Sequence, residues 1–187
     1  LQQRVANGSL SANTTISIVT FVQSATTLDM NPVTAGVQIA TPVNTDANGN
    51  SIPDVIEKLR AIVAGNESFT NYQAPLQATA NIFTQLATPN GAGFMVFLSD
   101  GSHNLTSVTT ITPELNALRG NPPTTPLTNH KLIAFGVGPS ANVGSTTGVT
   151  LKAIDPNATQ LTNPADIVSV LAQLPQSFND VYLPGVT

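Results

Sequence analysis

The sequence predicts an α/β protein with a Rossmann-like, doubly wound and mostly parallel sheet that is flanked by helices. Short continuous apolar runs, typical of strands buried on both faces, occur at residues 16–21, 94–98 and 132–137. Segments with helical periodicity lie between these runs. Alternating strands and helices imply right-handed crossovers, and ligands of such sheets bind at the carboxyl ends of the strands.

The helical segments have recognisable ends. Pro53 can open a helix whose apolar face runs from Val55 to Val63 until Gly65 ends it. Residues 76–86 carry an apolar stripe after Pro75, and a shorter helix is expected to begin at residues 112–114. A last helix is expected at residues 163–174, with Asn163 as its cap.

Length and composition limit the possible functions. The 187 residues suit one domain, expected at residues 1–177, followed by an extension or linker strand at residues 178–187. A net charge of -4 with only six Lys and Arg argues against a nucleic-acid partner. No apolar run is long enough for a membrane span, and the lack of cysteine excludes thiolate metal sites. Charged residues make up only 9% of the chain, and neutral polar residues take their usual place. This composition favours a secreted or bacterial cell-surface protein.

The sharpest local motif is DANGNSIPDVIE at residues 46–57. Its oxygen ligands fall at the positions from which a loop surrounds a hard cation, so we expect calcium there. The stretch resembles the loops of thrombospondin type 3 and dockerin-type repeats, except that Ser51 replaces a glycine. The alternative is an Asn/Gly-rich turn that caps the following helix. The expected ligands are Asp46, Asn48, Asn50, Ile52 through its carbonyl, Asp54 and Glu57.

A second, distributed pattern resembles the von Willebrand factor A family. The apolar run at residues 16–21 is followed by FTNYQAPL at residues 69–76, FLSDG at residues 97–101 and AFGVG at residues 134–138. These segments occur in the order and at the spacings of that family. The resemblance covers nearly the whole chain and implies the fold described above.

The resemblance also implies part of a metal-ion-dependent adhesion site. By motif match its Thr is Thr70 and its Asp is Asp100, with magnesium or manganese as the ion. Ser99, Ser102 and His103 would lie near the ligand. The alternatives are a helix cap for Thr70, a turn carboxylate for Asp100 and a solvent-facing loop histidine for His103.

The chain departs from the family pattern at one place. The D-x-S-x-S motif and the first strand that carries it do not occur in the sequence, in which residues 1–6 look like the end of the first helix. We therefore expect another segment or another chain to supply this strand. Without it, a gap of roughly 9–10 Å would divide the sheet.

The expected function is that of an extracellular binding module, and not of an enzyme. Such a module would engage a protein or glycan ligand with the help of a metal, while calcium stiffens residues 46–57. No nucleophile elbow or Ser-His-Asp set is recognisable. The alternative function is a structural subunit of an extracellular filament or sheath with a degenerate adhesion site.

Overall fold

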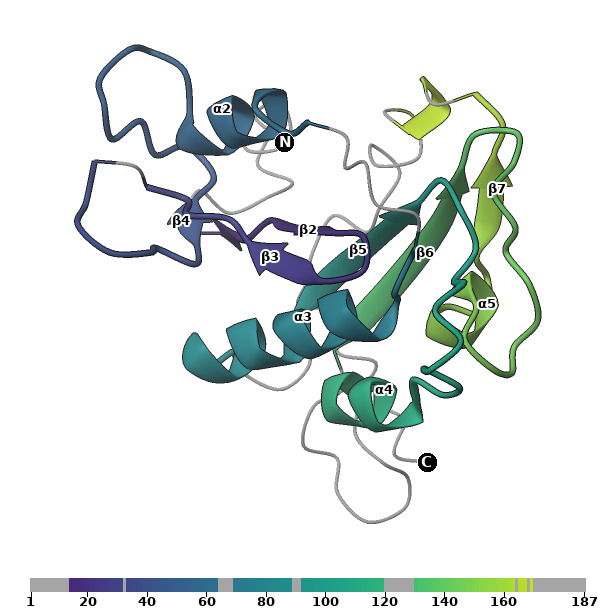
Figure 1. The fold of residues 1–187 in the computed structure, drawn as a ribbon. Helices are drawn as coiled ribbons and strands as arrows, with labels where there is room; N and C mark the ends of the chain where they lie inside the picture. Colours follow the sequence, from purple (N-terminus) through teal and green to yellow (C-terminus); the bar gives the residue numbers. More distant parts are fainter. Residues whose placement is uncertain are drawn as a thin grey trace, which may run out of the picture.

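The computed structural model of the chain describes residues 14–31, 33–63, 69–88, 92–119, 130–163, 165–167 and 169. Figure 1 shows a small parallel sheet beside a β-hairpin, with helices packed around them. The elements are β1 (Thr15–Ile16), β2 (Val19–Phe21), β3 (Ala25–Thr27), β4 (Thr41–Pro42), α2 (Asp54–Arg60), α3 (Gln73–Gln85), β5 (Phe94–Ser99), α4 (Thr112–Arg119), β6 (Lys131–Val137), α5 (Leu151–Ile154) and β7 (Thr159–Leu161).

The central sheet is parallel and has the strand order β5-β6-β7. Strands β5 and β6 pair from Phe94 with Lys131 to Ser99 with Gly136, and β7 joins only opposite the end of β6. The chain is therefore a mixed α/β protein with a three-stranded parallel sheet and flanking helices. The apolar runs predicted as the second and third strands match β5 and β6 to within one residue.

The main core lies between this sheet and three helices. Alternate residues of β5 and β6, such as Met95 and Ala134, face α3, α4 and α5, because strand side chains alternate between the faces of a sheet. All three helices thus cover the same face. The cluster comprises Tyr72, Leu76, Met95, Phe97, Ile111, Leu118, Leu132, Ala134, Leu151, Ile154 and Ala158.

The predicted strand at residues 16–21 is wrong in its extent and its pairing. The structure divides it into β1, which pairs with β4, and β2, which forms an antiparallel hairpin with β3. The residues of β2 are only half-buried, and Val22 and Ser24 close a tight turn by a hydrogen bond of 3.0 Å. Because the polar residues at positions 23–24 allow this turn, the chain reverses direction instead of crossing over.

The hairpin and the parallel sheet do not share a backbone ladder in the described part of the chain. Figure 1 shows β2 lying beside β5, and side chains make the connection. The Phe21 ring lies 5.0 Å from that of Phe97 and 6.4 Å from that of Tyr72, measured between centroids. The described strands thus form separate sheets and not one continuous sheet.

The predicted helices are placed correctly but differ at their ends. Helix α2 ends at Arg60, and the side chains of Leu59, Ile62 and Val63 are exposed, so the expected apolar face to residue 63 is wrong. Only the first turn of α2 packs inward, and tertiary packing decides where a marginal helix ends. Helix α3 buries Leu76 and Ile82, and α4 begins at residue 112 as expected.

Some expected features lie outside the described residues. These are the helix end at residues 1–6, the stop at residue 65, the extension at residues 178–187 and most of the helix at residues 163–174. At the start of that last helix, the Asn163 Oδ1 accepts a hydrogen bond of 3.1 Å from the Ala165 N–H, as expected for a cap. Among the helices that are described, none is both long and apolar enough to cross a bilayer.

Candidate functional site

The loop after β5 and the segment before α3 lie against each other at the carboxyl end of β5. The Thr70 N–H donates to Asn104 Oδ1 at 2.6 Å, and the Asn104 N–H donates to the Thr70 carbonyl at 3.1 Å. A Cβ added to Gly101 would lie 3.7 Å from Thr70 Oγ1. The structure thus brings Thr70 beside the turn that carries Asp100, and we call this region, residues 70–72 with 99–104, the rim.

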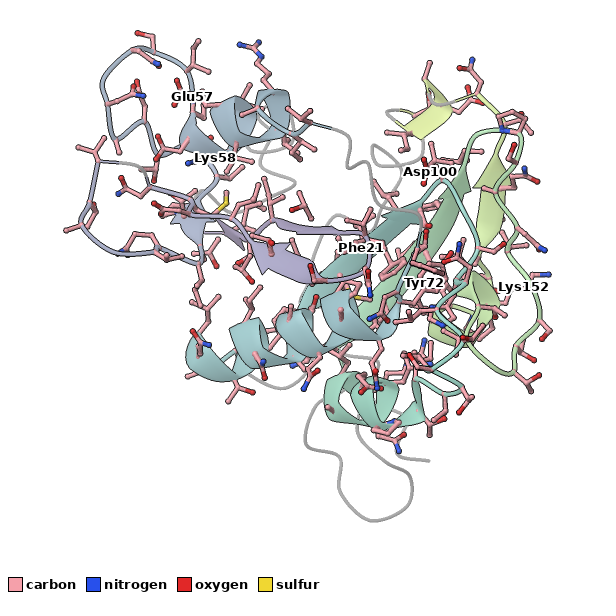
Figure 2. All side chains as sticks on the ribbon, viewed as in Figure 1. Phe21, Glu57, Lys58, Tyr72, Asp100 and Lys152 are labelled. Carbon is pink, nitrogen blue, oxygen red and sulfur yellow. The ribbon has the colours of Figure 1, made fainter. Side chains whose placement is uncertain are left out.

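Two hydroxyl groups hold the turn of Asp100 from below. Both Tyr72 Oη and Ser99 Oγ donate to the Gly101 carbonyl, at 2.5 and 2.9 Å. Burial raises the pKa of the Tyr72 hydroxyl, so this group stays a neutral donor at physiological pH. The Asp100 side chain is exposed above the turn, where Figure 2 shows it at the upper edge of the sheet.

His103 braces the rim from the inside. Its Nδ1 accepts a hydrogen bond from the Tyr72 N–H at 3.2 Å. Its Nε2 therefore carries the proton and donates to the carbonyls of Leu105 and Val108 at 3.0 and 3.1 Å. Both ring nitrogens have hydrogen-bond partners, and His103 is half-buried. Ser99 is buried and bonded to Gly101. Of the three residues expected at the ligand surface, only Ser102 is exposed.

Sequence reasoning did not find Asn71, which ties the hairpin to the rim. Its N–H donates to the Val22 carbonyl at 2.8 Å, and its Nδ2 donates to the Gln23 carbonyl at 3.0 Å. Its Oδ1 accepts from the Gln73 N–H at 2.9 Å and so starts α3. The end of β2, the start of α3 and the loop after β5 therefore converge, although no sequence signal marks Asn71 beyond its place between Thr70 and Tyr72.

The predicted calcium loop lies between β4 and α2, with its backbone wrapped around Asp46. The Asp46 Oδ1 accepts from the N–H groups of Gly49 at 2.8 Å and Asn50 at 3.1 Å, and its Oδ2 accepts from Ser51 at 2.7 Å. Gly49 and Ser51 adopt φ angles of 72° and 68°. Ser51 thus takes the left-handed conformation for which such loops use glycine at this position.

The other expected ligands gather in the same loop. Asn48 Nδ2 donates to Glu57 Oε2 at 3.0 Å, and Asn50 Nδ2 donates to Glu57 Oε1 at 2.5 Å. The Asp54 Oδ1 accepts from the Ala47 N–H at 3.1 Å. Ile52 lies in the same loop, where its N–H donates a hydrogen bond to Asn50 Oδ1 at 2.8 Å.

Asp54 provides a test of whether the loop suits a cation. Its side chain is 0% exposed, and its Oδ2 is buried without a hydrogen-bond partner. Leaving a carboxylate oxygen buried and unpaired is costly, and a hard cation with oxygen ligands would remove that cost. In the described ranges no three carboxylate, imidazole or thiolate groups cluster tightly enough to hold a metal. A cation here would therefore depend on Asn and carbonyl oxygens as well.

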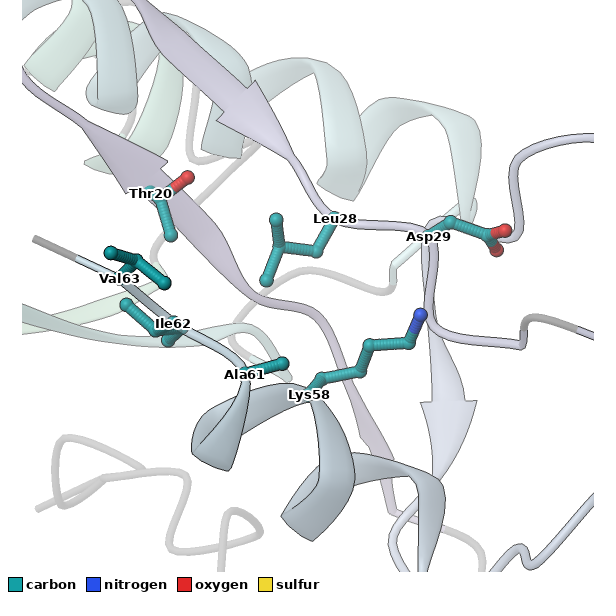
Figure 3. Close-up of a pocket in the computed structure, with 7 residues that line it drawn as sticks. All are labelled: Thr20, Leu28, Asp29, Lys58, Ala61, Ile62 and Val63. Atoms are coloured by element: carbon teal, nitrogen blue, oxygen red, sulfur yellow. The ribbon is translucent and has the colours of Figure 1, made fainter. Parts of the chain in front are cut away.

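A pocket of about 300 Å³ lies between α2 and the hairpin. Figure 3 shows the Lys58 side chain extending toward Asp29, with Leu28 and Ile62 on the apolar side. Hydrogen bonds from the Gln38 and Asn31 N–H groups lower the pKa of Asp29, with a smaller contribution from the charge of Lys58. None of the residues that line this pocket is an expected ligand, and Lys58 directly follows Glu57 in the sequence.

The fold and the rim define an α/β domain with a polar loop cluster at the carboxyl end of its parallel sheet. Comparison with protein-family models, curated proteins and solved structures finds no match to this chain. The functional conclusion therefore rests on the residues and their arrangement.

Proposed function

We propose that the chain is an extracellular binding module of the von Willebrand factor A type, in which a metal at the rim assists the binding of a protein or glycan ligand. The observation that carries this proposal is the pair of hydrogen bonds between Thr70 and Asn104, which brings a hydroxyl beside the turn of an exposed carboxylate. A carboxylate and a hydroxyl are ligands that magnesium and manganese accept, and they leave positions for an acidic group of the partner.

The proposal includes the strand that the family places between the hairpin and the parallel sheet. The described residues leave β2 and β5 without a common ladder, with the rings of Phe21 and Phe97 in contact between them. A strand supplied by another segment or another chain would bring the missing D-x-S-x-S ligands to the rim. It would also join the hairpin and the parallel sheet into one larger sheet of the family's kind.

The proposal further assigns calcium to residues 46–57, where it stabilises the loop and takes no part in chemistry. Asp46, Asn48, Asn50, Asp54, Glu57 and the Ile52 carbonyl would hold the ion. The unpaired oxygen of the buried Asp54 is the main support. A secreted or cell-surface location, where calcium is abundant, agrees with this assignment and with the 9% of charged residues.

Manganese binding tests the rim. With the calcium loop saturated by calcium, we expect Asp100→Ala and Thr70→Ala to raise the dissociation constant for Mn²⁺ by at least about tenfold, which corresponds to ~1.4 kcal/mol. Electron paramagnetic resonance of free Mn²⁺ measures this constant. Thr70→Ser keeps the hydroxyl and should bind as the unaltered chain does. Equal affinities for Asp100→Ala and the unaltered chain would refute the assignment of the rim.

A further inference from the structure

We propose that the side-chain amides of Asn48 and Asn50 form an internal latch on Glu57, which closes the loop without a cation and which calcium must displace. This inference rests on the proposed calcium loop and concerns its regulation. It starts from the carboxylate of Glu57, which lies in the first turn of α2. Each of its two oxygens accepts one amide N–H, from Asn48 at 3.0 Å and from Asn50 at 2.5 Å.

The orientation of both amides follows from contacts at their other ends. Asn48 Oδ1 accepts from the Asn50 N–H at 3.1 Å, and Asn50 Oδ1 accepts from the Ile52 N–H at 2.8 Å. Rotating either amide by half a turn would set its NH₂ group against a backbone N–H and its oxygen against the Glu57 carboxylate. Both exchanges replace attraction by repulsion, so the hydrogen-bond network allows only the orientation described.

Neutral hydrogen-bond donors satisfy the carboxylate oxygens of the loop, with one exception. Backbone N–H groups bind both oxygens of Asp46, and the two Asn amides bind both oxygens of Glu57. The exception is Asp54 Oδ2, which is fully buried and unpartnered. This buried oxygen is the independent sign of a cation ligand, since no hydrogen bond in the structure satisfies it.

The latch and calcium compete for the same two oxygens of Glu57. A calcium ion bound by both oxygens of this carboxylate would take the place of the two amide hydrogens. Part of the binding free energy is then spent on breaking two charge-assisted hydrogen bonds. Asparagine at positions 48 and 50 therefore gives a loop that stays closed at low calcium and binds the ion less tightly than aspartate would.

Changing both asparagines to aspartate removes the amide donors but nearly keeps the shape of the side chains. The change therefore separates closure of the loop from its affinity for calcium. In the Asn48→Asp/Asn50→Asp variant of the full chain, carboxylates would face Glu57 and repel it. In chelator we expect amide hydrogens of residues 46–57 to exchange at least about tenfold faster than in the unaltered chain, because local opening becomes easier. With calcium, the added charge should lower the dissociation constant for Ca²⁺. Hydrogen exchange with mass spectrometry and calcium titration measure the two quantities.

A matched control exists in another exposed loop. Asn142 Oδ1 accepts from the Gly144 N–H at 2.8 Å, in a turn like those of the latch but away from any carboxylate pair. Asn142→Asp should change neither quantity. Equal exchange of the double variant and the unaltered chain in chelator would overturn the latch. If instead the unaltered chain did not respond to calcium, the calcium assignment would fail, and the exchange in chelator would still decide whether the amides close the loop.

Discussion

His130 and Gly93 are in contact at the amino ends of β5 and β6, where space is tight. The Gly93 N–H donates to His130 Nδ1 at 3.0 Å, and a Cβ on Gly93 would lie 2.5 Å from that nitrogen and 2.9 Å from the Phe83 ring. Only glycine fits here. Burial lowers the pKa of His130 below its ordinary 6.5, because a desolvated imidazolium is unfavourable. Protonation would also remove the acceptor that Gly93 uses.

This geometry predicts how stability depends on pH. His130 binds a proton more readily in the unfolded chain than in the folded chain. Its contribution to the free energy of unfolding is therefore complete above pH 6.5 and declines as pH falls from there toward the lowered pKa. One such group changes stability by at most about 1.4 kcal/mol per pH unit. Urea unfolding between about pH 5 and pH 8 measures the slope.

The variant His130→Asn tests the origin of that slope. Its amide oxygen can replace Nδ1 as acceptor for Gly93 but does not titrate in this range. We expect a flatter pH dependence below pH 6.5 than in the unaltered chain. His103 is present in both chains, so the difference between the two slopes belongs to His130. Identical slopes would show that this imidazole does not resist protonation.

At the scale of single residues, the sequence indicated that residues 46–57 form one loop and that Thr70 and Asp100 belong to one region, while both metal sites stay predictions. Ligand spacing is local, so Asp46 and Glu57 could be found without a fold. The burial of Asp54 depends on tertiary packing and had no local signal. His103 could not be recognised as a brace, because its partner Tyr72 lies 31 residues away.

At the scale of elements, a carboxylate extends the sheet where β7 is too short. Strand β7 pairs with β6 only from Phe135 onward. Before that point, Asp155 Oδ2 accepts from the Ala134 N–H at 3.2 Å, while its Oδ1 accepts from the Asn157 N–H at 2.9 Å. One buried side chain thus satisfies a strand N–H and closes the turn before β7.

Removing this carboxylate should destabilise the fold. In Asp155→Ala the buried Ala134 N–H loses its partner, which costs about 1–3 kcal/mol in the free energy of unfolding. Asp155→Asn keeps one acceptor oxygen and should lose clearly less. Urea unfolding at neutral pH compares the variants. Equal stability of Asp155→Ala and the unaltered chain would contradict this role for Asp155.

The elements that the sequence predicted share one property, which is length. Strands β5 and β6 have six and seven residues and helix α3 has 13, so each carries a full apolar pattern. Strands β3 and β7 have three residues each and α5 has four, which is too short for a period to be recognised. The division of residues 16–21 into β1 and β2 was missed because partners, and not propensity, separate them.

At the scale of the whole molecule, the loop of residues 46–57 and the rim are separate. Figure 2 shows Glu57 at the end of the molecule that carries α2 and Asp100 at the carboxyl end of β5. The family pattern could predict that Thr70 and Asp100 approach each other, since the order of its segments places both residues at the same end of the sheet. It could not predict this separation.

The separation predicts independent responses to the two metals. Calcium at about 100 times its dissociation constant should stabilise the chain by about 2.7 kcal/mol, seen as a higher melting temperature than in chelator. Asp46→Asn should abolish most of this shift and leave Mn²⁺ binding at the rim unchanged. Titrating each metal while the other is saturating measures both. A loss of Mn²⁺ affinity in Asp46→Asn would show that the two regions are coupled.

The hairpin of β2 and β3 is attached to the parallel sheet through the ring contact of Phe21 with Phe97. Asn71 and Tyr72, just before α3, hold it by hydrogen bonds and a ring contact, and α3 packs against it. Detaching it breaks these contacts but leaves the β5-β6-β7 ladder whole. We therefore expect residues 19–27 to open locally at a lower free energy than global unfolding requires. A protease that cleaves such transiently opened chain would cut the hairpin while the helices and the ladder stay folded.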